Sequence, residues 1–261
     1  MTPDPSTSPT SARGGTDGEP LLRLRGVHTH VGPYHILHGV ELEVPKGGTT
    51  LLLGRNGAGK TSTLRTIMGL WRASAGIIEF RGQPLQGLRT PDVAARGIAY
   101  VPENMGIFAD LSVAENLLLA ARAAADLDAI DAARLQWIFD LFPPLKTFWH
   151  HPAGLLSGGQ KQMLAVARAI VEPRELILVD EPSKGLAPAI IANMIEAFAE
   201  LKKSRTTVLL VEQNFQFARR LGDTVAVMDD GRIVHHGLMS ELAEDEALQQ
   251  RLLGLGLGAH Q

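Results

Sequence analysis

One short segment of the chain has the residue types and spacing of a phosphate-binding loop. The run Gly54–Thr61 has the pattern G-x-x-x-x-G-K-T and follows an apolar stretch, Leu51–Leu53, of strand length. Good helix formers continue from Thr61 onward. Glycines let the backbone curl so that its N–H groups face an anion, and a helix N-terminus adds partial positive charge. We therefore expect a nucleotide phosphate site made of Gly54, Arg55, Asn56, Gly57, Ala58, Gly59, Lys60, Thr61 and Ser62.

Two side chains of this loop have distinct expected roles. The Lys60 ammonium can reach the β- and γ-phosphates, and the Thr61 hydroxyl can ligate Mg²⁺. The ordinary alternative is a glycine-rich turn with a surface lysine. The complete motif, placed between a strand and a helix, favours the phosphate loop.

A pair of acids ends a second apolar run. Leu176–Val179 is followed directly by Asp180 and Glu181. Beside a phosphate loop, Asp180 is expected to hold Mg²⁺ and Glu181 to polarise the attacking water as general base. Alone, the pattern would equally suit a strand that ends in a solvated acidic turn.

A third segment has the features of a second anion-binding turn, with Ser157 as a helix N-cap and two glycines that expose N–H groups. One chain with one nucleotide loop has no local use for two such turns. A second copy offers one, because its turn could close on the γ-phosphate held by the first. The alternative is a simple capped helix. The segment comprises Leu156, Ser157, Gly158, Gly159 and Gln160.

The elements that position these residues alternate between strands and helices at both ends of the chain. Strands are expected at Leu22–Val27, Glu41–Val44, Thr49–Leu53, Gly76–Phe80, Ile98–Val101, Leu176–Val179 and Thr206–Val211, and a closing hairpin at Thr224–Met228 and Arg232–His236. Helices are expected within Ser112–Asp140, which Pro143-Pro144 ends, and at Ser157–Val171, Pro188–Lys202, Gln213–Leu221 and Met239–Leu253. This order predicts a parallel sheet with antiparallel additions and an inserted helical block, roughly residues 104–160.

Bulk composition excludes several classes of protein. The 261 residues are 45% hydrophobic and carry a formal net charge of -3, so a basic nucleic-acid-binding surface is not expected. No cysteine is present, which rules out disulfides and thiolate metal sites. No apolar run approaches the roughly 18 residues of a membrane span. We expect a disordered leader at 1–20, one domain at 21–253 and a flexible tail at 254–261.

The three motifs together occur in the order and spacing of ATP-binding-cassette ATPases, which the chain resembles over about residues 21–253. Local segments narrow the resemblance to the ATP-binding subunits of branched-chain amino acid importers, of the type called LivF, in a subfamily that also serves amides and urea. These segments are Val101-Pro102-Glu103, Gly185-Leu186-Ala187-Pro188 and Val211-Glu212-Gln213-Asn214.

The resemblance implies an α/β fold, the nucleotide-binding domain of P-loop NTPases, with an antiparallel β subdomain and an inserted helical subdomain. It implies an ATPase that uses ATP and Mg²⁺ and pairs with a second, related cassette. Two membrane permease subunits and, indirectly, an extracytoplasmic binding protein are the other implied partners, with no nucleic acid. The implied location is peripheral, on the cytoplasmic face of the inner membrane.

Three positions depart from the family pattern. Glu103 stands where a Mg²⁺-sensing glutamine is expected, so it is assigned to the metal site but adds negative charge near the γ-phosphate. Val31 replaces the aromatic residue that stacks on adenine, and Tyr34 is the candidate substitute. Gln213 replaces a histidine; its amide can donate a hydrogen bond to the γ-phosphate and has no titratable charge.

Two alternative functions for this chain differ in class from a transport ATPase. A cassette protein of translation or DNA maintenance would usually carry two cassettes or a very long coiled coil, and this chain has neither. A regulatory module that binds nucleotide without turnover would fit the departures at Glu103 and Gln213. The apolar segment Met105–Phe108 could form an edge for a membrane subunit's helix, or its residues could pack in the core of the helical block.

Overall fold

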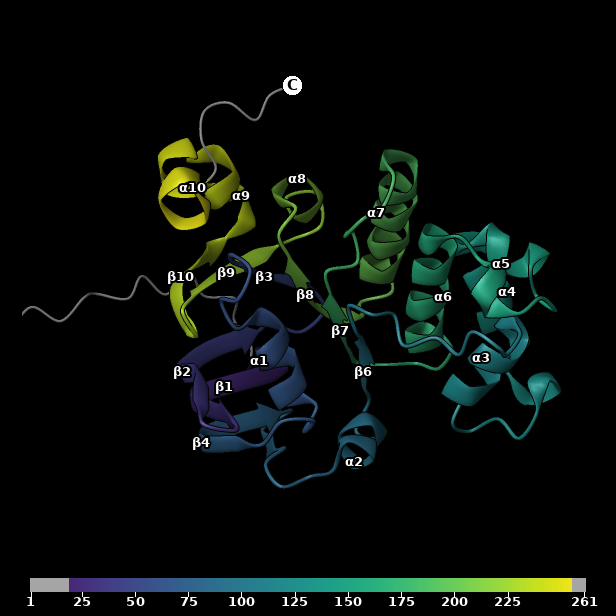
Figure 1. The fold of residues 1–261 in the computed structure, drawn as a ribbon, viewed down its shortest axis with the longest axis horizontal. Helices are drawn as coiled ribbons and strands as arrows, with labels where there is room; N and C mark the ends of the chain where they lie inside the picture. Colours follow the sequence, from purple (N-terminus) through teal and green to yellow (C-terminus); the bar gives the residue numbers. More distant parts are fainter. Residues whose placement is uncertain (1–18, 255–261) are drawn as a thin grey trace, which may run out of the picture.

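The computed structural model describes residues 19–254, in which two β-sheets and a group of helices surround two hydrophobic cores (Figure 1). The larger sheet has the strand order β10-β9-β3-β8-β7-β6. Its five strands from β9 to β6 are parallel, and β10 is antiparallel to β9. Their bounds are β3 (Thr49–Leu53), β6 (Ile98–Val101), β7 (Leu176–Asp180), β8 (Thr207–Glu212), β9 (Thr224–Asp229) and β10 (Arg232–Leu238).

The central strands of this sheet are buried on both faces. Every residue of β3, β7 and β8 is buried, as expected for parallel strands that are covered on both sides. Their apolar runs end at the same edge of the sheet, because parallel strands all point one way. The phosphate loop and the Asp180-Glu181 pair therefore leave the sheet next to each other.

The smaller sheet is antiparallel, with the order β2-β1-β4-β5. Helix α1 (Lys60–Ile67) packs in one core with both sheets, because Leu64 and Ile67 cluster with Leu24 of the small sheet and Leu52 of the large one. The sheet strands are β1 (Leu22–Val31), β2 (Tyr34–Val44), β4 (Ala73–Phe80) and β5 (Gln83–Pro84).

The other core joins the helices to the opposite face of the large sheet, where Leu117, Ile138 and Leu164 cluster with Ile177 and Leu210. Figure 1 shows α3–α6 gathered on one side of the molecule, away from the antiparallel sheet. The helical elements are α2 (Thr90–Ala95), α3 (Val113–Ala120), η1 (Leu127–Ala129), α4 (Ala132–Leu141), α5 (Pro143–Thr147), η2 (Ala153–Leu155), α6 (Gly158–Ile170), α7 (Pro188–Lys203), α8 (Phe215–Ala218), α9 (Met239–Glu244) and α10 (Glu246–Leu253). Across residues 19–254, no helix combines the length and the apolarity that crossing a bilayer requires.

The expected α/β fold with an antiparallel sheet and a helical part is confirmed, but three expected helical stretches differ. Ser112–Asp140 contains α3 and α4, with only the short η1 between them, and Pro143, which was expected to end this region, is the first residue of α5. Gln213–Leu221 contains only the short α8, because Asn214 caps a helix that ends at Ala218. Met239–Leu253 is two helices rather than one. Asp245 has non-helical backbone angles and its side chain caps α10 at Leu248, a break that an uninterrupted amphipathic pattern hides.

The expected domain limits stay predictions. The leader and tail fall mostly on residues 1–18 and 255–261, which lie outside the described part of the chain. The helical elements α3, α4 and α5 fall inside the expected block 104–160, and α6 runs past it to Ile170.

A glycine in the β9–β10 hairpin fastens the two sheets to each other. Gly231 has φ +70°, its N–H donates to Ala58 O at 2.8 Å, and its carbonyl accepts from His38 N at 2.9 Å. A Cβ at this position would lie 2.2 Å from Ile36 O. The backbone of β2 thus approaches too closely for a side chain.

Gly231→Ala is therefore expected to lower the free energy of unfolding by about 3 kcal/mol or more, because steric overlap adds to the cost of positive φ. Gly82→Ala is the matched control: it sits in the two-residue β4–β5 turn at φ +69°, with no atom near its would-be Cβ. That variant should lose only about 1 kcal/mol. Urea unfolding of both measures the difference; equal losses would contradict the steric explanation.

Candidate functional site

The phosphate loop joins β3 to the N-terminus of α1, as expected. Gly57 and Gly59 both have positive φ, and Gly59 is the left-handed N-cap of the helix. A Cβ at Gly54 would lie 2.2 Å from Met228 O, so the end of β9 requires a glycine there. The loop follows the path that directs N–H groups toward an anion.

The ammonium of Lys60 lies inside this loop. Its Nζ donates to Gly54 O at 2.9 Å and to Arg55 O at 3.1 Å, and lies 3.6 Å from Glu181 Oε1. Burial lowers the pKa of Lys60, and the nearby Glu181 carboxylate opposes that shift. A desolvated cation held by neutral carbonyls can interact strongly with phosphate oxygens.

Asp180 and Thr61 meet at the end of β7, with Thr61 Oγ1 donating to Asp180 Oδ1 at 3.0 Å. The Tyr100 hydroxyl donates a hydrogen bond to the other carboxylate oxygen, Oδ2, at 3.3 Å. Burial raises the pKa of Asp180 to about 6, while the bond from Thr61 opposes the shift. A carboxylate and a hydroxyl beside a phosphate loop are oxygen donors that Mg²⁺ prefers, so these residues fit that ion.

Glu181 is fixed by its backbone and by a neighbouring amide. Its φ is +49°, which is rare outside glycine, and its N–H donates to Val211 O at 2.9 Å. Gln213 Nε2 lies 2.5 Å from Glu181 Oε1 and 2.5 Å from Asn56 Oδ1. Gln213 thus links the phosphate loop to the expected general base, a contact that the motif alone did not reveal.

Glu212 is a site residue that sequence reasoning missed. It is 2% exposed, and its carboxylate accepts from the backbone N–H groups of Ser183, Gln213 and Asn214 at 2.9–3.1 Å. Burial raises its pKa, while these bonds oppose the shift. One carboxylate therefore holds the loops after β7 and β8 together. The available signal was an acid directly after an apolar run, Val208–Val211, the same signal used for Asp180.

The Ser-Gly-Gly turn caps α6 as expected. Ser157 Oγ accepts from Gln160 N, and Gln160 Oε1 accepts from Ser157 N at 2.9 Å. A Cβ at Gly159 would lie 2.8 Å from Ile190, whereas the space around Gly158 is open. Within residues 19–254, no hydrogen bond joins this turn to the phosphate loop of its own chain. Leu156 is buried in the helical core.

The remaining candidates lie in the loop after β6, at the start of β2 and in the first turn of α1. Glu103 pairs with Lys184, with 2.5 Å between Oε1 and Nζ. Tyr34 starts β2 opposite Val31, and its side chain is exposed. Ser62 lies in the first turn of α1, where its carbonyl accepts from Thr66 Oγ1 at 2.8 Å.

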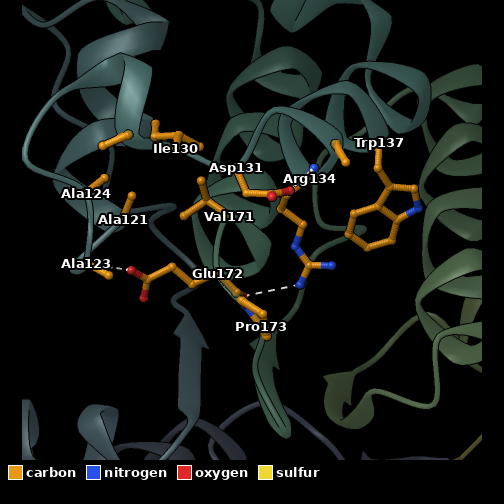
Figure 2. Close-up of a pocket in the computed structure, with 12 residues that line it drawn as sticks. Ala121, Ala123, Ala124, Ile130, Asp131, Arg134, Trp137, Val171, Glu172 and Pro173 are labelled. Carbon is orange, nitrogen blue, oxygen red and sulfur yellow. Dashed lines mark hydrogen bonds between the residues drawn. The ribbon is translucent and has the colours of Figure 1, made fainter.

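Of two pockets in the structure, one is lined by residues of the phosphate loop and the other is not. A pocket of about 200 Å³ borders the phosphate loop and is lined by Arg55, Asn56 and Gln213 among others. A wider one, about 610 Å³, lies beside α4, where Arg134 reaches toward the Glu172–Pro173 segment (Figure 2). No residue of the phosphate loop lines the wider pocket.

Comparison with known proteins agrees with this geometry. The sequence pattern of the family described as ABC transporter matches residues 37–184, more than half of the chain. The chain belongs to the ABC transporter family. It is an ATP-binding cassette of the ATPase type coupled to transport, as the resemblance implied.

Two curated relatives match nearly full length. One is the high-affinity branched-chain amino acid transport ATP-binding protein BraG of Pseudomonas aeruginosa, 38% identical over 90% of this chain and 100% of the relative. The other is the probable branched-chain amino acid transport ATP-binding protein LivF of Archaeoglobus fulgidus, 34% identical over 90% and 99%.

Solved cassettes have the same fold. An ATP-binding subunit of an ABC transporter is 29% identical, with a TM-score of 0.76 and coverage of 90% of this chain and 96% of that one. A nucleotide-free cassette from an ABC transporter, 24% identical with a TM-score of 0.75, covers 91% and 99% and supports the fold alone.

Replacing the buried carboxylate of Asp180 is expected to stabilise the protein in the absence of magnesium and nucleotide. Because folding raises the Asp180 pKa from 3.8 to about 6, its contribution to stability is lost as pH rises through that window. Above it, the charged form costs about 3 kcal/mol. Asp180→Asn should therefore be more stable than the parent at pH 8 and nearly equal at pH 4, by urea unfolding. A gap that widens toward acid pH would contradict this explanation.

Gln213→Ala is expected to lower ATP turnover by about ten-fold or more, because the amide that orients Glu181 is lost. Nucleotide affinity should stay within about two-fold, since the phosphate loop keeps its own contacts. Phosphate release and calorimetric titration measure the two quantities. Gln216→Ala, an exposed position on α8, is the control and should match the parent. A parallel fall in affinity and turnover would argue against an orienting role.

Proposed function

We propose that this chain is the ATP-hydrolysing subunit of an importer for branched-chain amino acids. The observation that carries the proposal is the meeting of Lys60, Thr61, Asp180 and Glu181 at the carboxyl edge of the parallel sheet. Near-full-length similarity to BraG and LivF supports the substrate class.

The roles follow from the contacts. The loop N–H groups and Lys60 bind the phosphates, and Thr61 and Asp180 would hold Mg²⁺, which when bound supplies charge to the phosphate oxygens. Glu181, oriented by Gln213, polarises the attacking water and accepts its proton. The water oxygen bonds to the γ-phosphorus as the bond from that phosphorus to the bridging oxygen breaks, so ADP and phosphate are released. Glu181 then gives up its proton to solvent and is regenerated.

A second cassette completes each site. The capped N-terminus of α6 presents Ser157 and Gly158 to solvent, beside Leu155, which is 72% exposed. An apolar side chain next to free N–H groups suits an interface with another cassette rather than open water. We expect a related cassette as the partner, so that each Ser-Gly-Gly turn faces the phosphate loop of the other subunit.

A groove on this chain suits a helix of a membrane subunit. A hollow of about 700 Å³ is lined by Trp71, Pro102, Met105 and Gly106 among others. Phe108, 50% exposed, lies on the same segment. We assign this groove to a cytoplasmic helix of one of two permease subunits. On this proposal the cassette lies peripherally on the cytoplasmic face of the inner membrane, and an extracytoplasmic binding protein is an indirect partner.

Glu181→Gln is the direct test of the enzymatic part. Removing the base should lower phosphate release by about a hundred-fold or more, because an amide cannot accept the proton. ATP binding should persist, since Lys60 and the loop are unchanged, and calorimetry measures it. Unaltered turnover would reject Glu181 as the base, and absent ATP binding by the parent would reject the function. Uptake of labelled leucine by vesicles that contain the assembled importer tests the substrate class.

A further inference from the structure

One lysine outside the family motifs connects two loops of the site. Lys184 follows β7 and extends to Glu103, which follows β6, with Nζ 2.5 Å from Glu103 Oε1. The same Nζ lies 3.5 Å from Glu181 Oε2. A single ammonium therefore lies between the residue that replaces the expected glutamine and the expected general base.

The backbone that carries Lys184 is well anchored. Its N–H donates to Glu181 O at 3.2 Å, and the neighbouring Ser183 N–H donates to the buried carboxylate of Glu212 at 2.9 Å. Gly185 turns the chain with φ +70° directly afterwards. The side chain of Lys184 thus projects from a fixed base, even though it is 58% exposed.

Charge explains why this lysine matters for the reaction. Asp180 and Glu181 already place two carboxylates at the site. The negative charge of Glu103, like that of Glu181, raises the pKa of Asp180. A bound triphosphate adds further negative charge. An unpaired Glu103 would repel it, whereas the Glu103–Lys184 pair is neutral overall, as a glutamine is.

We propose that Lys184 is a positioning residue for ATP hydrolysis: it neutralises Glu103 and, through its second contact, holds the carboxylate of Glu181 in the site. The inference rests on the proposed function, because it assigns a role within that reaction. The pair is partly exposed, so its contribution to folding stability is small. The pair acts on the reaction instead, because it determines the net charge beside the phosphates.

A double-mutant cycle tests the assignment in the full-length chain, with Lys184→Met, Glu103→Gln and the double variant. Lys184→Met leaves Glu103 uncompensated and should lower kcat about ten-fold, with KM for ATP within about two-fold. Glu103→Gln leaves the ammonium free to pair more tightly with Glu181, so kcat should also fall. The double variant restores neutrality and should recover to within about three-fold of the parent, and the remaining loss is that of the Lys184–Glu181 contact.

Two further variants separate this role from a structural one. Lys184→Arg keeps the charge and should retain most of the activity. Lys203→Met removes another exposed lysine, one that pairs with Glu200 on α7, and should match the parent. Thermal unfolding midpoints of all variants should agree within a few degrees, because each change lies at the surface.

The outcomes divide the two proposals. An active parent with Lys184→Met at parental kcat, or a double variant whose loss equals the product of the single losses, overturns the role of Lys184 alone. A parent that binds but never hydrolyses Mg·ATP overturns the proposed function instead. A lowered unfolding midpoint in Lys184→Met that is also found in Lys184→Arg and in the double variant with Glu103→Gln marks a structural role. That result also overturns the inference.

Discussion

The site depends on holding one ammonium and several carboxylates out of water at a single edge of the sheet. Lys60, Asp180, Glu181 and Glu212 are each 8% exposed or less. Buried charges are costly unless each has partners, and here each has them: backbone carbonyls for Lys60, hydroxyls for Asp180, the Gln213 amide for Glu181, and backbone N–H groups for Glu212. The pKa of Lys60 falls and that of Asp180 rises because the compensation is incomplete. An incoming metal and phosphate can relieve this residual cost of burial, because the charges that meet them are already in place.

The two cores explain how this edge is kept rigid. Helix α1 packs between the sheets, so the phosphate loop is anchored at β3 on one side and at the helix on the other. Gly231 adds a third attachment through Ala58. The helical group packs against the opposite face of the large sheet through a separate core. Ala58 of the phosphate loop packs in the first core, and Leu156 of the Ser-Gly-Gly turn packs in the second. This arrangement suits sites that are completed between two cassettes.

The loops that follow β6, β7 and β8 act as one unit, because polar contacts made by three side chains join them to one another and to the phosphate loop. Glu212 ties the β8 loop to Ser183, Gln213 ties it to Asn56 and Glu181, and Lys184 ties the β7 loop to Glu103. The departure at Glu103 is thus accompanied by a lysine that cancels its charge. The departure at Gln213 has a comparable explanation, since its amide contacts the residue assigned as base without any need to titrate.

The sequence by itself determined the features that depend on neighbours along the chain. The spacing of Gly54–Thr61, the acids after Leu176–Val179, the N-cap Ser157 and the Asp230-Gly231 turn are local patterns, and each has its expected conformation. Only the tertiary structure decided the pairings between distant positions. Lys184 and Glu103 are 81 residues apart, and Gln213 and Asn56 are 157 apart. No periodicity encodes such contacts, because they follow from the strand order β3-β8-β7-β6, which brings separate loops to one edge of the sheet.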